Sequence, residues 1–301
     1  KAKPAPEIQQ ARFLNNGRPF IMLGDRKITP VFWHAIATIR KERFHEFPLA
    51  ERCGTDNFRL CADFQDFWTG ENQYDFSKFD RAVELMYAAQ PDAVFCVHIN
   101  SQMPAWWLDA NPDEVCTFQD GSRTGADQYK QSLASRKWVN DAAVPIRALI
   151  DHMRSQPYAD HVWGISVAES NNGEWFWDNT DSKRQLSWGG YNKTDLEFFR
   201  DCVKEKYGTD EALAAAWHRP GMTFDQIDTL PDWHLVQQGT LGRLKDPVQD
   251  QMLMDWLESR NIALGNAICQ FGKIVKDATD GKWLFGKVVK SEARSELLVF
   301  L

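Results

Sequence analysis

Short apolar runs alternate with longer amphipathic stretches along this sequence. Residues 57–63, 93–100 and 162–168 form compact runs rich in Val, Phe, Ile and Ala, which are typical of strands buried on both faces. Residues 74–86 and 138–155 lie between them and carry apolar side chains at helical spacing. Because buried strands alternate with helices, the pattern predicts parallel β/α/β units.

Further elements extend this order toward both ends of the chain. A Ser residue at position 77 is the expected N-cap of the helix over 74–86. The other predicted elements are a hairpin around Asn16-Gly17 over 12–22, a strand over 28–34, a helix to about Cys53, helices over 196–207, 210–217 and 247–277, and a fifth parallel strand over 282–289. The order predicts an α/β fold.

A (β/α)₈ TIM barrel accounts best for this order, and the chain supplies about five of its eight strands. We therefore expect a barrel that is truncated within this sequence. The predicted organisation is an N-terminal hairpin over 1–27 and an incomplete barrel over 28–301, with a helical insertion over about 178–277. A doubly wound sheet is the main rival, but it requires a Gly-rich phosphate loop after an early strand, and the sequence has none.

Polar residues follow the predicted strands. His34, Asp63, Asn100 and Glu169 each stand at or just beyond a strand end, and His98 lies two residues before Asn100. Because the carboxyl ends of the strands of a barrel share one face, we expect these side chains to meet there. The pattern predicts a binding or catalytic site on that face.

Composition narrows the class of protein. A net charge of -7 argues against nucleic-acid binding, and no apolar run approaches the roughly 20 residues of a membrane helix. The six cysteines are scattered without a C-x-x-C pair, and His and Cys never cluster at ligand spacing, so we expect no metal site. The sequence has no recognisable signal segment, so a soluble protein is expected that is either cytoplasmic or exported with its signal removed.

Thirteen tryptophans set this chain apart. Several are clustered beside other aromatic residues, as in Phe67-Trp68, Trp106-Trp107 and Trp175-Phe176-Trp177. A tryptophan presents a flat apolar face beside a polar N–H group, which suits the apolar faces and polar rims of sugar rings. Core filling is the alternative for any single tryptophan, but the clusters together favour a sugar-binding cleft.

Three stretches resemble glycoside hydrolase family 42, the β-galactosidase-like enzymes, and in particular a divergent bacterial branch of that family. They are Tyr-Asp-Phe-Ser-Lys-Phe-Asp-Arg over 74–81, Met-Pro-Ala-Trp-Trp-Leu over 103–108 with Pro-Asp-Glu and Asp-Gly further on, and the segment 199–217 with its Lys-Tyr-Gly-Thr and final Trp. No stretch is diagnostic alone, but their order along the chain matches the family. The resemblance implies a (β/α)₈ fold and a bacterial enzyme of carbohydrate metabolism without a cofactor.

The resemblance also implies retaining hydrolysis of a β-galactoside, in which one carboxylic acid protonates the leaving oxygen and a second carboxylate attacks the sugar. The family carries its acid/base in an Asn-Glu pair after strand four and its nucleophile on strand seven. Here Glu169 and Ser170 occupy the positions of that pair. The acid/base candidates are therefore Glu174, which stands beside Trp175, and Glu169, and the nucleophile is expected beyond Leu301.

Side chains near the predicted strand ends and in the aromatic clusters are expected to bind an oligosaccharide or glycoside. They are His34, Arg59, Asp63, Asp66, Trp68, His98, Asn100, Trp106, Trp107 and Trp175. Two alternatives remain: a catalytically inactive carbohydrate-binding barrel, which the altered strand-four pair would suit, and a glycosidase for uronic or sulfated sugars. The sequence predicts no nucleic-acid or membrane partner and is compatible with a homo-oligomer.

Overall fold

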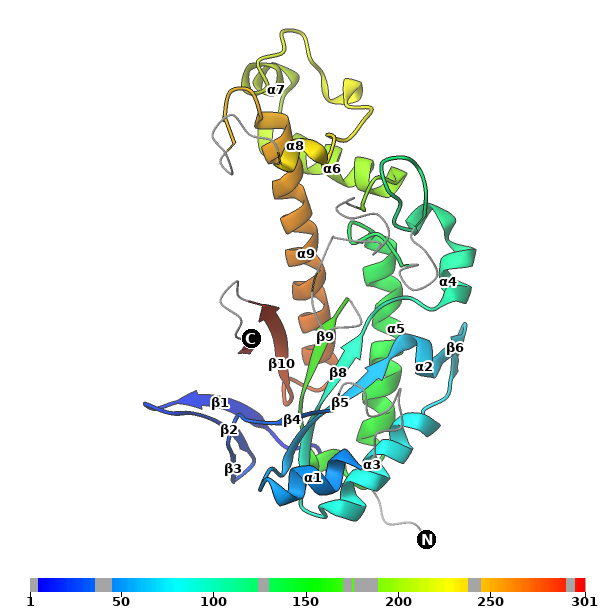
Figure 1. Cartoon of the computed structure of the whole chain (residues 1–301), viewed down its shortest axis with the longest axis vertical. Coiled ribbons are helices and arrows are strands. Elements are labelled where there is room, and N and C mark those ends of the chain that lie inside the picture. The colour runs from blue at the N-terminus through cyan, green and yellow to red at the C-terminus, as the bar shows by residue number, and fades with distance from the viewer. Residues whose placement is uncertain are drawn as a thin grey trace. The chain divides into compact units, whose positions relative to one another are not determined.

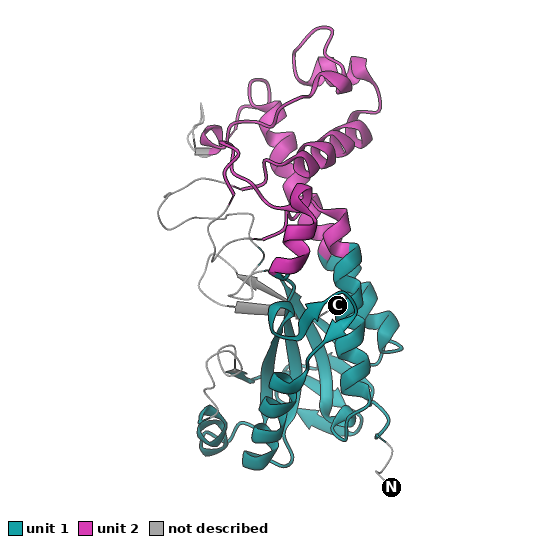
Figure 2. Ribbon diagram, turned by 90° about the vertical axis from the view of Figure 1, so that its right-hand side faces the viewer, with its two compact units in different colours: residues 1–104, 140–175, 268–301 teal, residues 105–139, 176–267 magenta. Residues whose placement is uncertain are grey.

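A computed structural model describes residues 5–35, 45–123, 130–169, 175, 189–237, 245–290 and 296–300. The chain divides into two compact units (Figure 2). Unit 1 comprises residues 1–104, 140–175 and 268–301, and unit 2 comprises residues 105–139 and 176–267. The domain boundaries predicted from the sequence stay predictions.

A mixed sheet is the centre of unit 1 (Figure 1). Within the described residues its order is β11-β10-β9-β8-β5-β4. These strands are β4 (Trp33–Ala35), β5 (Asn57–Asp63), β8 (Val94–Asn100), β9 (Val162–Ala168), β10 (Leu284–Lys290) and β11 (Glu296–Phe300). The first five pair in parallel in chain order, which confirms the predicted β/α barrel arrangement.

Helices connect the parallel strands, as the sequence predicts. They are α1 (Glu46–Arg52), α3 (Ser77–Ala89), α5 (Arg136–Arg154) and α9 (Gln251–Ala278), with the 3₁₀ turn η2 (Ala159–His161) before β9. The helix α3 buries Phe79, Val83 and Met86 at spacings of three and four residues. The β5 residues Phe58 and Leu60 are fully buried, so the strand contributes to the same apolar core.

A meander of short antiparallel strands precedes the sheet. It consists of β1 (Ala11–Asn15), β2 (Pro19–Leu23) and β3 (Arg26–Ile28). Gly17 has a φ of 84° in the β1–β2 turn, a conformation that glycine adopts without steric cost. Apolar residues of the meander cluster with Val94, Cys96 and Trp163, so it packs against the first halves of β8 and β9.

A short segment rich in aromatic residues follows β5. It contains α2 (Phe64–Phe67) and the two-stranded ribbon of β6 (Trp68–Gly70) and β7 (Gln73–Tyr74), none of which the sequence predicts. The Ser77 N-cap prediction is wrong, because Phe76 is the N-cap and Ser77 is already helical. The Asp75 side chain accepts a hydrogen bond from the Ser77 backbone N–H, the first of the helix, at 2.9 Å.

Unit 2 is mainly helical. It contains α4 (Ala105–Ala110), η1 (Pro112–Glu114), α6 (Lys193–Tyr207), α7 (Asp210–Ala216), η3 (Phe224–Gln226), α8 (His234–Gln237) and the first part of α9. Its core contains Phe199, Trp217 and Trp256, and the first two rings stack at 6.3 Å. Gly208 has a φ of 73° and ends α6, while Thr209 caps α7 by accepting the Ala212 N–H.

The outer edge of the fifth parallel strand is covered by a further strand. β11 pairs with β10 in antiparallel register from Gly286↔Phe300 to Lys290↔Glu296. The run Leu297 to Phe300 that the sequence left without an element is therefore a strand. Its pairing satisfies the backbone groups along one side of β10.

Candidate functional site

Residues of β5 and β8 alternate between two chemically different faces. The positions Phe58, Leu60 and Ala62 on β5, and Phe95, Val97 and Ile99 on β8, are apolar and buried. The intervening positions are Asn57, Arg59, Cys61 and Asp63 on β5, and Cys96, His98 and Asn100 on β8, and these too are buried. Because successive side chains of a strand point to opposite faces, one face of this sheet is lined with polar and small side chains. We call it the polar face.

A row of hydrogen bonds crosses the polar face. Nη2 of Arg59 lies 2.5 Å from Nδ1 of His98, and Oγ of Ser166 on β9 lies 2.9 Å from the same nitrogen. A guanidinium group only donates, so Nδ1 must accept, and His98 is a neutral imidazole that carries its proton on Nε2. All three residues are at most 3% exposed, so their relative positions are fixed by packing as well as by hydrogen bonds.

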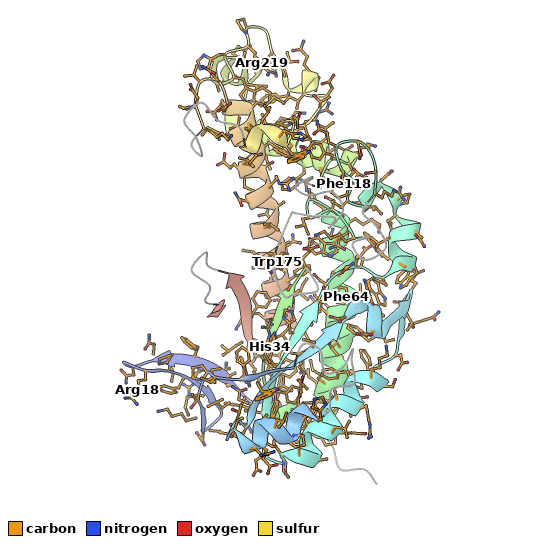
Figure 3. All side chains as sticks on the ribbon, viewed as in Figure 1. Arg18, His34, Phe64, Phe118, Trp175 and Arg219 are labelled. Atoms are coloured by element: carbon orange, nitrogen blue, oxygen red, sulfur yellow. The ribbon has the colours of Figure 1, made fainter. Side chains whose placement is uncertain are left out.

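His34 extends this row onto β4, where it is the register partner of Arg59 (Figure 3). Burial, and then the charge of Arg59, lower the pKa of His34 to about 4, so the ring is neutral at physiological pH. Its Nδ1 is buried and has no hydrogen-bond partner among the described residues. The ring therefore has a nitrogen available for a ligand at the start of the polar face.

The strand ends bring three further predicted residues onto adjacent positions. Asp63 pairs in register with Asn100, Asn100 pairs with Ala168, and Glu169 is the next residue of the chain. The carbonyl of Ala168 accepts hydrogen bonds from the backbone N–H and the hydroxyl of Ser101, at 2.8 and 2.7 Å. These bonds fix the backbone just before Glu169, whose side chain is fully buried.

Other predicted site residues of unit 1 have structural contacts. Asp66 accepts a hydrogen bond from Lys78 at 3.0 Å and is half-buried. Trp68 is 5% exposed and packs edge-on against Phe64 at 5.8 Å. Trp175 is half-buried with its ring 6.1 Å from that of Phe271. These three stay predictions as sugar-binding residues, but each also stabilises the fold around it.

The remaining predicted residues lie elsewhere. Trp106 and Trp107 belong to α4 of unit 2, where Trp107 is 3% exposed beneath the ammonium of Lys137 and Trp106 is half-buried. Glu174, the first acid/base candidate, lies outside the described residues. The structure thus brings together His34, Arg59 and His98 in one row, and Asp63, Asn100 and Glu169 at the strand ends beside it.

Ser166 is the member of the hydrogen-bonded row that sequence reasoning missed. It lies inside the apolar run 162–168 and looks like a tolerated small residue in a buried strand. Gly164 and Ser166 stand four and two residues before Ala168, the last residue of β9, so their side chains lie on the same face of the sheet as that of Ala168. This alternation is the signal that could have found Ser166. Its hydroxyl completes the row with Arg59 and His98.

Unit 2 contains a separate buried carboxylate, Asp255, whose side chain is 1% exposed. Oδ1 accepts hydrogen bonds from Lys206 at 2.9 Å and Gln251 at 2.8 Å, and Oδ2 accepts from Tyr207 at 2.8 Å and Trp217 at 2.7 Å. Four donors fill the roughly four acceptor positions of a carboxylate. Asp255 is therefore saturated and acts as a structural centre that ties α6, α7 and α9 together.

In two of the stretches that carry the family resemblance, the characteristic side chains make contacts that stabilise the fold. In 74–81, Asp75 accepts the first backbone N–H of α3, and Asp80 accepts from Nε2 of His152 on α5 at 2.7 Å. In 199–217, three of the characteristic side chains are those that donate to Asp255. These residues of the resemblance therefore stabilise the packing of the helices, and their contacts give no information about substrate binding.

Within the described part of the chain, no group of three or more His, Cys, Asp or Glu side chains is arranged to hold a metal ion. None of the described helices is long and apolar enough to cross a lipid bilayer.

Comparison with known proteins places these features in a family context. The family model for glycoside hydrolase 42, described as beta-galactosidase, matches residues 69–232. No curated protein sequence is significantly similar to this chain.

Solved structures share the fold. The beta-galactosidase of the psychrophilic Marinomonas ef1 superposes with a TM-score of 0.60 at 16% identity, over 85% of this chain and 36% of that one. The beta-galactosidase of Halorubrum lacusprofundi gives 0.58 at 17% identity, over 85% and 35%. The catalytic domain of the beta-amylase of Paenibacillus polymyxa gives 0.61 at 14% identity, over 82% and 62%. The chain therefore spans about a third of the length of the beta-galactosidases it resembles.

Proposed function

This chain belongs to glycoside hydrolase family 42, and from that premise we propose that it forms the part of a β-galactoside-cleaving enzyme that binds the sugar and supplies the acid/base. The substrate is a glycoside or oligosaccharide with a terminal β-linked galactose-like ring. No cofactor takes part, since two carboxyl groups are sufficient for glycoside hydrolysis.

The polar face is the observation that supports this proposal. Buried strands normally carry apolar side chains on both faces in a parallel sheet, and a buried polar group costs free energy unless it is satisfied. Here Arg59, His98 and Ser166 cross three adjacent strands at the depth where a barrel is usually filled with Val, Ile and Leu. Polar side chains in such positions match the several hydroxyl groups of a sugar ring.

Two carboxyl groups compete for the acid/base role. Glu169 directly follows β9, at the carboxyl end of a strand of the sheet, and is fully buried. Glu174 is the second candidate, five residues further along and next to Trp175. In either case the acid protonates the leaving oxygen while a second carboxylate, about 5 Å away in a retaining enzyme, attacks the sugar carbon.

An inactive carbohydrate-binding barrel is the second candidate function. The observation that favours it is the strand-four sequence Ala168-Glu169-Ser170, in which the family's Asn-Glu pair is absent. Such a protein would keep His34, Arg59 and the neighbouring polar side chains for binding but would not cleave the bond. Binding and turnover must therefore be measured separately.

The experiment uses the complete enzyme of which this chain is proposed to be a part, because hydrolysis also needs the second carboxylate. It is a calorimetric titration with a galactose-configured iminosugar and its glucose-configured epimer, followed by an assay with nitrophenyl β-galactoside. Preferential binding of the galacto epimer with turnover supports the hydrolase, and the same binding without turnover supports the inactive barrel. Absence of binding to either epimer contradicts both. Glu71→Gln, an exposed change in the β6–β7 turn, is the matched control for a Glu169→Gln variant.

A further inference from the structure

A cavity of about 550 Å³ lies in unit 1 between α3 and the segment that leads from α5 to β9. Its walls include Tyr87, Tyr158 and His161, with Asp80 and Glu84 on α3. We call it the α3 pocket. Since β8 and β9 start just after these segments, the pocket is at the amino ends of the strands. A strand of seven residues such as β8 spans roughly 20 Å, so the polar residues at the strand ends form a different site.

Aromatic rings give the α3 pocket fixed walls. Tyr87 and Tyr158 are nearly parallel, with centroids 6.3 Å apart and planes at 26°. His161 meets Tyr87 edge-on at 5.6 Å, and Tyr158 also packs on the buried Phe95 at 5.6 Å. Because neighbouring rings hold each wall, the pocket is organised before any ligand arrives, which lowers the entropic cost of binding.

The charge of the lining is negative. Asp80 and Glu84 contribute carboxylates, and no Lys or Arg is among the residues that line the cavity. Glu84 is largely exposed and contacts Arg81 at 3.4 Å on the surface, a weak pairing in water. Asp160 also lies close enough to act on the Tyr87 hydroxyl, with Arg26 partly opposing it. An anionic ligand is therefore disfavoured.

Most polar groups of the lining are already engaged. Nδ1 of His161 donates to the carbonyl of Ala93 at 2.8 Å, and the Tyr158 hydroxyl donates to Asp80 at 3.5 Å. Asp80 also accepts from His152 at 2.7 Å. The Tyr87 hydroxyl is the exception, because it is buried and has no hydrogen-bond partner among the described residues. A sugar needs several free donors and acceptors around its ring, so this lining suits a ligand that needs aromatic faces and negative charge.

From this combination we propose that the α3 pocket binds a small organic cation, a substituted ammonium group on an apolar body. Aromatic faces attract such a cation through the ring quadrupole, and the two carboxylates add charge complementarity. The volume lies within the range of roughly 300–1,000 Å³ that small-molecule sites occupy.

Choline and 3,3-dimethylbutan-1-ol test the proposal, because they have the same shape and differ in charge. Both are titrated into the ¹⁵N-labelled chain while amide shifts are followed. Choline should bind at least about fivefold more tightly than the neutral alcohol, the factor expected for a cation on aromatic rings. Its shifts should concentrate on residues 80–91 and 156–161. Equal binding of the two probes, no binding of either, or stronger binding of galactose at these residues would overturn it.

Three variants and one control sharpen the test. Tyr87→Leu should weaken choline binding by about tenfold or more, whereas Tyr87→Phe should stay within about twofold, because phenylalanine retains the ring face. Glu84→Gln should weaken binding by about threefold, since its exposed charge is screened by water. Glu71→Gln, exposed and away from the pocket lining, should leave it unchanged. If Tyr87→Leu and Tyr87→Phe weaken binding equally, the aromatic face is not the binding element and the proposal fails.

Discussion

The two buried polar clusters of this molecule differ in whether they have room for a ligand. In unit 2 the carboxylate of Asp255 is surrounded by four donors and has no acceptor position left. In unit 1 the row of Arg59 and His98 ends at His34, whose Nδ1 has no partner among the described residues. A saturated cluster stabilises a fold, whereas a cluster with an available polar atom can also bind. Burial of charge alone does not distinguish the two.

The largest expected effect tests the saturated cluster. Asp255→Ala should lower the free energy of unfolding by about 3–5 kcal/mol, because it leaves the Lys206 charge and several donors without their acceptor. Desolvation works against the lysine charge, yet hydrogen bonds to Glu258 and Asp255 raise the pKa of Lys206 above its ordinary value, so the ammonium depends on these partners. Urea denaturation followed by tryptophan fluorescence measures the loss.

Glu258→Gln is the matched control, because Glu258 contacts the same ammonium at 2.5 Å from a position that is 53% exposed. Its removal should cost no more than about 1 kcal/mol. If the two variants lost the same free energy of unfolding, Asp255 would be an ordinary ion-pair partner. The contrast between a saturated cluster in unit 2 and an open one in unit 1 would then fail.

The second expected effect concerns catalysis at the strand ends. Whichever of Glu169 and Glu174 is the general acid, its replacement by Gln in the complete enzyme should lower hydrolysis by about 10²-fold or more, and less for substrates with good leaving groups. The assay compares nitrophenyl and alkyl β-galactosides in wild type and both variants. Full activity in both variants would exclude this pair of candidates, and a loss confined to one identifies the acid.

The sequence predicted most of the sheet, because its strands are continuous apolar runs bounded by polar residues. The strands at 57–63 and 162–168 were predicted with the observed bounds. The short ribbon of β6 and β7 was missed since strands of two and three residues carry no periodic signal. The wrong cap at Ser77 arose because the helix begins one residue earlier than the serine suggests, with Asp75 accepting the N–H of Ser77.

The site was predictable as a location and less so as a set of contacts. Polar residues at strand ends identified Asp63, Asn100 and Glu169, since parallel strands place their carboxyl ends on one edge. The residue type did not reveal which tryptophans fill a core: Trp68 is almost fully buried against Phe64. Exposure of an aromatic ring depends on tertiary packing, which no local pattern encodes.

A smaller effect should separate the two tryptophans of α4. Trp106 is half-buried, so part of its ring is exposed, and Trp106→Ala should weaken glycoside binding by about 1–3 kcal/mol with little change in melting temperature. Trp107 is 3% exposed, and Trp107→Ala should chiefly lower the melting temperature. Calorimetric titration and thermal unfolding of both variants provide the measurements. The reverse result would make Trp107 the sugar platform and Trp106 a core residue.

The smallest expected effect is a pair of opposite pH dependences, one in each unit. Burial, and then Arg59, lower the pKa of His34 from 6.5 to about 4, so between these values the unfolded chain binds the extra proton. Stability therefore rises with pH in that window. Burial raises the pKa of Asp195 from 3.8 to about 6, against hydrogen bonding by Ser132, so between these values the native chain binds the extra proton. Stability therefore falls as pH rises there.

Urea denaturation at pH 4.5, 5.0, 5.5 and 6.0 measures both contributions in the range that they share. His34→Asn removes the rising contribution, so the unfolding free energy of this variant should increase less with pH than that of wild type. Asp195→Asn removes the falling contribution, so its unfolding free energy should increase more with pH. The amide keeps an oxygen that can accept from Ser132, which donates to Asp195 at 2.6 Å. If both variants changed the pH slope of the unfolding free energy in the same direction, the contrast would be contradicted. In this pH range, folding releases protons from His34 and takes up protons at Asp195, so the two groups contribute slopes of opposite sign.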